Sequence, residues 1–179
     1  MIIDTHTHTF PDRIAARALA GMEKSIVDKH DWNVKIKVAG TRDALSESTK
    51  KNGVDISVVV PVATKPEQSA SINEFAAQTN EKTKETGVFS LGAIHPDNED
   101  YKDILDDIKK KGLKGIKVHP DYQKVEFDDP RYLRIFKYAD ELGLVIVTHA
   151  GEDIGLPEKI HCTPDMVLNV LNKVNPKKL

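Results

Sequence analysis

Short apolar runs with little polar alternation recur along this chain. Continuous runs of this kind, rich in valine and isoleucine, are typical of strands that are buried on both faces of a parallel sheet. The sequence predicts five such strands, at residues 1–5, 55–63, 88–93, 115–119 and 144–148.

Amphipathic helices are predicted between these runs. Apolar residues at positions i, i+3, i+4 and i+7 begin at Tyr101, and Gly112 follows where a helix commonly ends. Two more helices are predicted to start at Asp129-Pro130 and at Thr163-Pro164, because a capping side chain followed by proline is typical of a helix start. Strand and helix therefore alternate, and this pattern predicts parallel βαβ units.

Residues 11–52 are predicted to form an excursion between the first two strands. A helix is expected after Pro11, and Thr41 is expected to cap a second helix that reaches Lys51. Apolar residues alternate with lysines at 34–38, which predicts a small edge strand or a hairpin arm.

The number of units limits the architecture. A closed (β/α)₈ barrel typically needs about 250 residues, whereas this chain has 179. We therefore expect the α/β class: a partial (β/α)₈ TIM barrel of about five strand-helix units with parallel strands. The chain is predicted to form a single domain over residues 1–179, with the C-terminal part of the barrel absent.

Charge and composition exclude several partners. The 26 basic and 28 acidic side chains leave a net charge of −2 without a basic patch, so neither nucleic acid nor a membrane surface is expected as a partner. The N-terminus lacks the basic and apolar regions of a signal peptide, and we expect a cytoplasmic protein. Cys162 is the only cysteine, so a metal would have to be bound by histidine and oxygen.

The strongest chemical signal is His6 and His8 at the end of the first predicted strand. Side chains at i and i+2 share one face of a strand, so both imidazoles can reach one divalent ion. The alternative is a chance pair on a polar loop that binds nothing.

Three further histidines follow the ends of predicted strands, and ligands gather at the carboxyl ends of parallel strands. They are His95, His119 and His149. The simpler interpretation is that these imidazoles cap exposed carbonyl groups. His161 and Cys162 are interpreted as loop residues, with the mouth of a pocket as the alternative.

Lys117 lies inside an apolar strand, where a charged group is costly unless it is paired or neutralised. It is a candidate for a carbamylated ligand, for a contact to a substrate carboxylate or for an ion-pair partner. Alternatively, its alkyl stem extends to the rim of the barrel.

These residues together resemble a known family. Asp-Thr-His-Thr-His-Thr-Phe-Pro at residues 4–11, Gly-Ile-Lys-Val-His-Pro at 115–120 and Val-Thr-His-Ala-Gly at 147–151 resemble the amidohydrolase superfamily, specifically its amidohydrolase-related (amidohydrolase 2) branch. The Phe-Pro pair favours this branch over the TatD-like nucleases and the polymerase-and-histidinol-phosphatase group.

The resemblance implies a metal-dependent barrel that binds one zinc or similar divalent ion per chain. It implies His6, His8 and His149 as metal ligands and His119, with Lys117, as residues that bind a small-molecule substrate. The implied reaction is attack of a metal-activated water on a C–N or C–O bond, or a related decarboxylation.

The sequence departs from the family pattern at its C-terminal end. The sixth-strand histidine and the eighth-strand aspartate of the family have no counterpart, so activity is expected to be impaired unless Asp4, Asp121 or Glu152 substitutes as base. The alternative is a non-catalytic metal- or ligand-binding half-barrel, and a phosphoesterase is the third choice. Open sheet edges favour a homo-oligomer.

Overall fold

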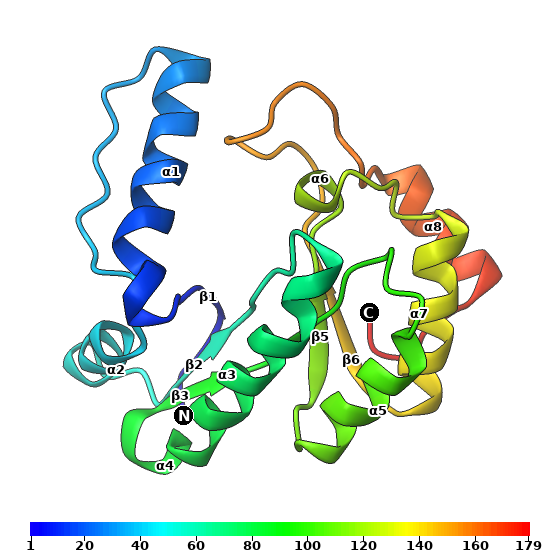
Figure 1. Cartoon of the computed structure of the whole chain (residues 1–179), viewed down its shortest axis with the longest axis horizontal. Helices are drawn as coiled ribbons and strands as arrows, with labels where there is room; N and C mark the ends of the chain where they lie inside the picture. Colours follow the sequence, from blue (N-terminus) through cyan, green and yellow to red (C-terminus); the bar gives the residue numbers. More distant parts are fainter. The chain divides into compact units, whose positions relative to one another are not determined.

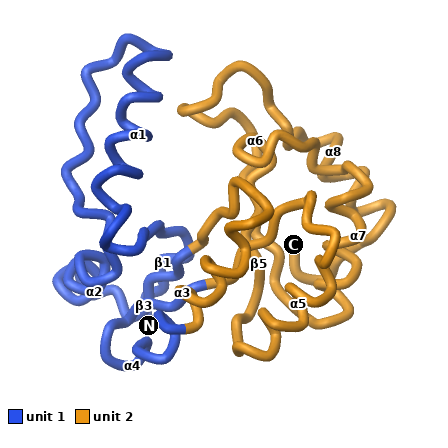
Figure 2. Tube along the Cα trace, viewed as in Figure 1, with its two compact units in different colours: residues 1–59, 78–90 blue, residues 60–77, 91–179 orange.

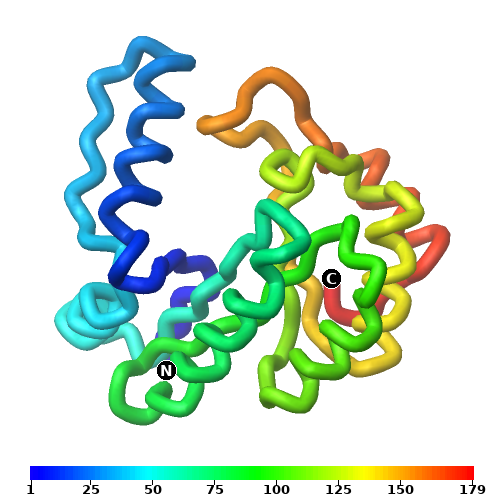
Figure 3. The backbone as a smooth tube through the Cα atoms, in the orientation of Figure 1, coloured from blue at the N-terminus to red at the C-terminus, as the bar shows by residue number.

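The computed structural model describes all residues 1–179 (Figure 1), and the course of the chain is followed in Figure 3. The chain divides into two compact units, which Figure 2 colours separately. Unit 1 comprises residues 1–59 and 78–90, and unit 2 comprises residues 60–77 and 91–179. Each unit contains a three-stranded parallel sheet. The prediction of a single domain over residues 1–179 stays a prediction.

The sheet of unit 1 has the order β1-β2-β3. Its strands are β1 (Ile3–Thr7), β2 (Ile56–Val59) and β3 (Val88–Ser90). The register between β1 and β2 shifts between Asp4 and Thr7. The Thr7 hydroxyl there donates a 2.9 Å hydrogen bond to the carbonyl oxygen of Val58. This irregularity lies next to the two histidines at the end of β1.

Three helices belong entirely to unit 1. They are α1 (Asp12–His30), α2 (Arg42–Lys51) and α4 (Thr83–Thr86). Thr41 caps α2 as predicted, since its side chain accepts from the backbone N–H of Ala44 at 3.3 Å. The prediction of an edge strand or a hairpin arm at residues 34–38 is wrong, because no strand forms there. The backbone N–H of Ile36 instead donates to the Glu23 carboxylate at 2.9 Å, so this segment bonds to α1 and not to a sheet.

The sheet of unit 2 has the order β4-β5-β6. Its strands are β4 (Gly92–Ala93), β5 (Gly115–Val118) and β6 (Val145–Thr148). Gly115 is required at the start of β5, because a Cβ atom there would collide with the carbonyl oxygen of Val145. The register pairs Gly115 with Val145 and Val118 with Thr148, so β5 and β6 end side by side.

The strand predicted at residues 88–93 is interrupted at Leu91, and β3 and β4 belong to different sheets. Two asparagines of α3 (Ser69–Glu81) bond the backbone beside the break. Asn73 accepts from the N–H of Ala93 at 2.8 Å and donates to its carbonyl at 3.1 Å. Asn80 bonds both backbone groups of Ser90 in the same way. Side-chain amides therefore satisfy backbone groups that a continuous ladder would otherwise pair.

Three helices of unit 2 begin where the sequence predicts. They are α5 (Tyr101–Lys110), α7 (Pro130–Glu141) and α8 (Pro164–Lys173). The short α6 (Pro120–Gln123) and the 3₁₀ turn η1 (Pro66–Gln68) were not predicted. Asp129 and Thr163 cap α7 and α8 with their side chains. The main hydrophobic core lies in this unit; its large members include Leu105, Ile108, Ile116, Tyr132, Ile135, Phe136 and Val170. This core holds β5 and β6 in place, and the candidate site lies at their carboxyl ends.

Candidate metal centre

In unit 1, His6 and His8 approach each other as the i, i+2 spacing predicts. Their Nε2 atoms are 3.2 Å apart, and the ring planes are inclined at 68°. Two ligand nitrogens at about 2.1 Å from a tetrahedral ion lie roughly 3.4 Å apart. The pair therefore already has the separation that two ligands of one ion require.

In unit 2, His119 and His149 lie next to each other, immediately after the paired ends of β5 and β6. The backbone N–H of His149 donates to the carbonyl oxygen of Val118 at 3.2 Å, which extends the parallel ladder by one bond. The imidazole rings stack with centroids 4.2 Å apart and planes within 6° of parallel. The strand-end rule therefore places these two histidines at one edge of the sheet, as predicted.

Two aspartates complete a polar cluster around the stacked histidines. The Oδ2 atom of Asp153 lies 3.3 Å from Nε2 of His119 and 4.0 Å from Nε2 of His149. The Oδ2 atom of Asp121 lies 3.9 Å from the same nitrogen of His149. The Oδ1 atom of Asp121 accepts from both the backbone N–H and the ring Nδ1 of His161, at 3.0 and 2.9 Å.

The sequence did not predict a role for Asp153, and His161 was interpreted as a loop residue, with the mouth of a pocket as the alternative. Asp153 follows His149 by four residues in the loop after β6, and its Oδ1 atom accepts from the N–H of Gly155 at 2.8 Å. No apolar periodicity marks this loop, so the only signal was the position of a carboxylate soon after a strand-end histidine. Glu152, which was considered as a base, is exposed.

Lys117 is completely buried in β5, and its Nζ atom has no hydrogen-bond partner. Burial lowers the pKa of Lys117 to about 8, and Cys162 nearby acts in the opposite direction. Cys162 is buried too, and burial raises the pKa of its thiol to about 11, so nothing activates this cysteine as a nucleophile. The role of Lys117 in substrate binding stays a prediction.

His95 and Gln123 occupy the same end of the sheet in unit 2. Burial lowers the pKa of His95, whose Nδ1 atom accepts from the backbone N–H of Asp97 at 3.2 Å. The Gln123 amide donates to the carbonyls of Ala63 and Ile94, at 2.8 Å each. Its oxygen accepts from the N–H of His119 at 2.9 Å and from the Tyr132 hydroxyl at 2.5 Å. Gln123 therefore fixes the backbone from which His119 extends.

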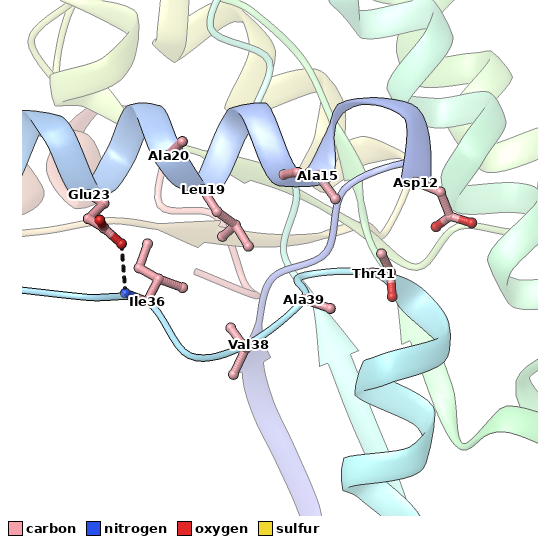
Figure 4. A pocket seen from close by; sticks show the side chains of 10 residues that line it. Asp12, Ala15, Leu19, Ala20, Glu23, Ile36, Val38, Ala39 and Thr41 are labelled. Carbon is pink, nitrogen blue, oxygen red and sulfur yellow. Dashed lines mark hydrogen bonds between the residues drawn. The ribbon is translucent and has the colours of Figure 1, made fainter.

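A groove of about 470 Å³ in unit 1 has a different character (Figure 4). Ala15, Leu19 and Val38 supply part of its mainly aliphatic lining, and the carboxylate of Glu23 in it bonds the backbone N–H of Ile36. It contains neither histidine nor cysteine. The clusters at the strand ends are therefore the stronger candidates for chemistry.

Comparison with known proteins shows the family of the chain. A family model described as amidohydrolase matches residues 3–172. The chain belongs to the amidohydrolase family. The match includes β1, with its histidine pair, and the whole of the polar cluster in unit 2. No curated protein matches this amidohydrolase chain.

Solved structures with the same fold include two decarboxylases and one probable hydrolase. A 5-carboxyvanillate decarboxylase from Novosphingobium aromaticivorans, complexed with manganese and 4-hydroxy-3-methoxy-5-nitrobenzoic acid, is 14% identical with a TM-score of 0.62, over 98% of this chain and 55% of that one. The 5-carboxyvanillate decarboxylase from Sphingomonas paucimobilis is 15% identical with a TM-score of 0.60. The match covers 97% of this chain and 60% of that one. A probable 2-pyrone-4,6-dicarboxylic acid hydrolase from Acinetobacter baumannii, with citric acid bound, is 12% identical with a TM-score of 0.55. The match covers 97% of this chain and 54% of that one.

This amidohydrolase chain thus spans little more than half the length of these three structures. Their likeness confirms the predicted α/β class with parallel strands, as part of an amidohydrolase barrel. No helix in the structure combines the length and the apolarity needed to cross a lipid bilayer.

The histidines of this amidohydrolase fit a divalent ion. The His6 and His8 nitrogens already have a ligand separation. The Nε2 atom of His149 is buried and has no hydrogen-bond partner, which is unfavourable for a polar atom unless something else binds there. Imidazole nitrogens and carboxylate oxygens are common ligands of zinc and manganese. That His6, His8 and His149 bind one ion stays a prediction.

Proposed function

We propose that the chain is a metal-dependent hydrolase of the amidohydrolase type, with one divalent ion, zinc or manganese, bound by His6, His8 and His149. The observation that carries the proposal is the 3.2 Å approach of the two Nε2 atoms in unit 1, together with the buried, unpartnered Nε2 of His149 in unit 2. The family match supports it, since it includes all three histidines.

A divalent ion supplies Lewis-acid polarisation of a substrate oxygen and lowers the pKa of a coordinated water. The protein's own residues would then bind and orient the substrate. His119 is held by its backbone bond to Gln123 and by its ring contact with Asp153. We propose that His119 helps to bind the substrate through the carboxylate that its ring contacts, and that Lys117 contributes positive charge from within β5.

The substrate class we propose is a small carboxylic acid or its ester, lactone or amide. Support comes from the names of the similar proteins, two of which are 5-carboxyvanillate decarboxylases and one a probable 2-pyrone-4,6-dicarboxylic acid hydrolase. Hydrolysis of a C–N or C–O bond is the first expectation, and release of carbon dioxide from an aromatic acid is the alternative. An assay that follows both hydrolysis and carbon dioxide release on one substrate panel separates the two reactions.

Metal analysis tests the ligand set. The purified chain, dialysed against a limited excess of Zn²⁺ or Mn²⁺, is expected to retain about one ion per chain. His6→Ala and His149→Ala are each expected to reduce this content strongly, although the two residues belong to different units. His30→Ala, in α1, is the matched control. Full metal content in both His6→Ala and His149→Ala would refute the proposed site.

We also propose a cytoplasmic protein that associates with further copies of itself. Self-association is supported by β1, which is an edge strand of its sheet and leaves Ile3 44% exposed. Light scattering is expected to show a dimer or larger species. A monomer at all concentrations tested would count against this part of the proposal.

A further inference from the structure

The Nε2 atom of His149 faces two carboxylates in unit 2. The Oδ2 atoms of Asp153 and Asp121 lie 4.0 Å and 3.9 Å away from it. Both this nitrogen and Oδ2 of Asp121 are buried without a hydrogen-bond partner. A buried nitrogen that lies near two carboxylate oxygens but bonds to neither indicates a place for a positive charge.

His119 is an unsuitable ligand for a cation at this place. Its ring is parallel to that of His149 within 6°, so the in-plane lone pairs of the two rings run side by side and do not meet at one ion. Its Nδ1 atom accepts from the backbone N–H of Tyr122 at 3.4 Å. The Nε2 atom therefore carries the proton and faces Oδ2 of Asp153 at 3.3 Å. His119 orients that carboxylate.

Asp153 is better placed than Asp121 to contact a cation. Ligand atoms of His119, His149 and Asp153 all lie within 4.8 Å of one another, a group that does not include Asp121. Asp121 has a side chain only 1% exposed, and its Oδ1 atom is bonded twice by His161. Asp153 is more accessible, with 11% of its side chain exposed, and the Gly155 N–H holds its other oxygen.

We infer that Asp153 is a further ligand of the divalent ion, beside His149, and that His119 positions its carboxylate. Two ligand atoms at about 2.1 Å from one ion lie about 3.4 Å apart at a tetrahedral angle and about 4.2 Å apart when they are opposite each other. The 4.0 Å between Nε2 of His149 and Oδ2 of Asp153 lies within this range. Asp121 contributes a second negative charge without direct contact. A hydrogen bond from an imidazole to a ligand carboxylate is a common outer contact in metal sites. This inference rests on the proposed role of His149.

Metal affinity tests the inference without any assay of activity. The full chain is titrated with Mn²⁺, and free Mn²⁺ is followed by its electron paramagnetic resonance signal. Asp153→Asn keeps an acceptor for the Gly155 N–H but removes the charge, and it is expected to weaken binding at least tenfold. Glu152→Gln removes the same charge from the neighbouring exposed position and is expected to change affinity less than twofold.

The outcomes separate this inference from the proposed function. If Asp153→Asn binds Mn²⁺ as Glu152→Gln does, while His149→Ala does not bind it, Asp153 is not a ligand and the proposed function survives. If His149→Ala also binds normally, both fail. Circular dichroism verifies that each variant is folded.

A second variant keeps the inference testable if Asp153→Asn does not fold. In the Co²⁺-loaded chain, Asp153→Glu is expected to change the visible absorption spectrum, because a longer side chain alters the geometry at the ion. An unchanged spectrum in Asp153→Glu would overturn the assignment.

Discussion

The imidazole rings of His119 and His149 stack face to face, with centroids 4.2 Å apart. The cause is the register of the sheet in unit 2, which pairs Val118 of β5 with Thr148 of β6. The next residue of each strand therefore emerges at the same level, although the two histidines are 30 positions apart in sequence. The Oδ2 atom of Asp153 lies 3.3 Å from Nε2 of His119 and 4.0 Å from Nε2 of His149.

Divalent metal is expected to stabilise the folded chain. A ligand that binds only the native state stabilises it by about 2.7 kcal/mol at a concentration one hundred times its dissociation constant. Mn²⁺ or Zn²⁺ should therefore raise the melting temperature of the wild-type chain, and a chelator should reverse the change. His8→Ala should lose most of this shift, and His30→Ala should keep it. An equal shift in both variants would contradict binding by the histidine pair.

Gln123→Leu is expected to destabilise unit 2. The substitution leaves the carbonyls of Ala63 and Ile94 and the N–H of His119 without their side-chain partner, together with the hydroxyl of Tyr132. A buried polar group without a partner costs about 1–3 kcal/mol, and these costs are not fully additive, so we expect a loss of about 3–5 kcal/mol in the free energy of unfolding.

Urea denaturation measures the effect of Gln123→Leu. The matched control is Asn172→Leu at an exposed position of α8, where the change should stay within about 0.5 kcal/mol. Similar losses in the two variants would show that the amide of Gln123 does not hold the strand ends.

Lys117→Met is expected to stabilise the chain at neutral pH. A pKa lowered from 10.5 to about 8 means that the charged form is penalised in the folded state, and the difference corresponds to about 3 kcal/mol. The unfolded chain binds more protons than the native chain between about pH 8 and 10.5. The free energy of unfolding of the wild type therefore rises with pH in this window. The stability that Lys117→Met gains over the wild type becomes smaller.

Unfolding by urea at pH 7 and pH 10 measures the Lys117 effect. Lys114→Met, at an exposed position just before β5, is the control and should show little difference at either pH. A Lys117→Met variant that is less stable than wild type at pH 7 would show that the ammonium group has a partner in the native protein.

Asp129→Ala is expected to destabilise α7 by about 1 kcal/mol at pH 7, since it removes the side chain that accepts from the N–H of Arg131 at 2.8 Å. Hydrogen bonds from Arg131 hold the pKa of Asp129 below its ordinary value of 3.8. The charged carboxylate therefore stabilises the fold above about pH 4, and this contribution is lost as the pH falls further.

Asp129→Asn separates the cap of α7 from its charge. Asparagine caps helices about as well as aspartate, so this variant should lose less stability than Asp129→Ala at pH 7. Thermal unfolding at pH 7 and pH 3 measures both. A difference between wild type and Asp129→Asn that grows at pH 3 would contradict the assigned role of the charge.

Local patterns determined much of the fold before any tertiary contact was known. Apolar runs identified the strands of both sheets, and capping residues such as Asp129 and Thr163 marked helix starts that the structure confirms. The same holds for part of the candidate site. His6 and His8 meet because positions i and i+2 share a strand face, a property of the backbone that needs no distant partner.

Tertiary structure alone decided the rest. The amides of α3 that bond the backbone on either side of Leu91, and the bond from Ile36 to Glu23 in place of a strand, depend on how the chain returns to itself. Asp153 enters the cluster only because the path of the loop after β6 brings its carboxylate to 3.3 Å from Nε2 of His119. The distance between such groups is set by sheet register and loop path, and neither leaves a periodic trace in the sequence.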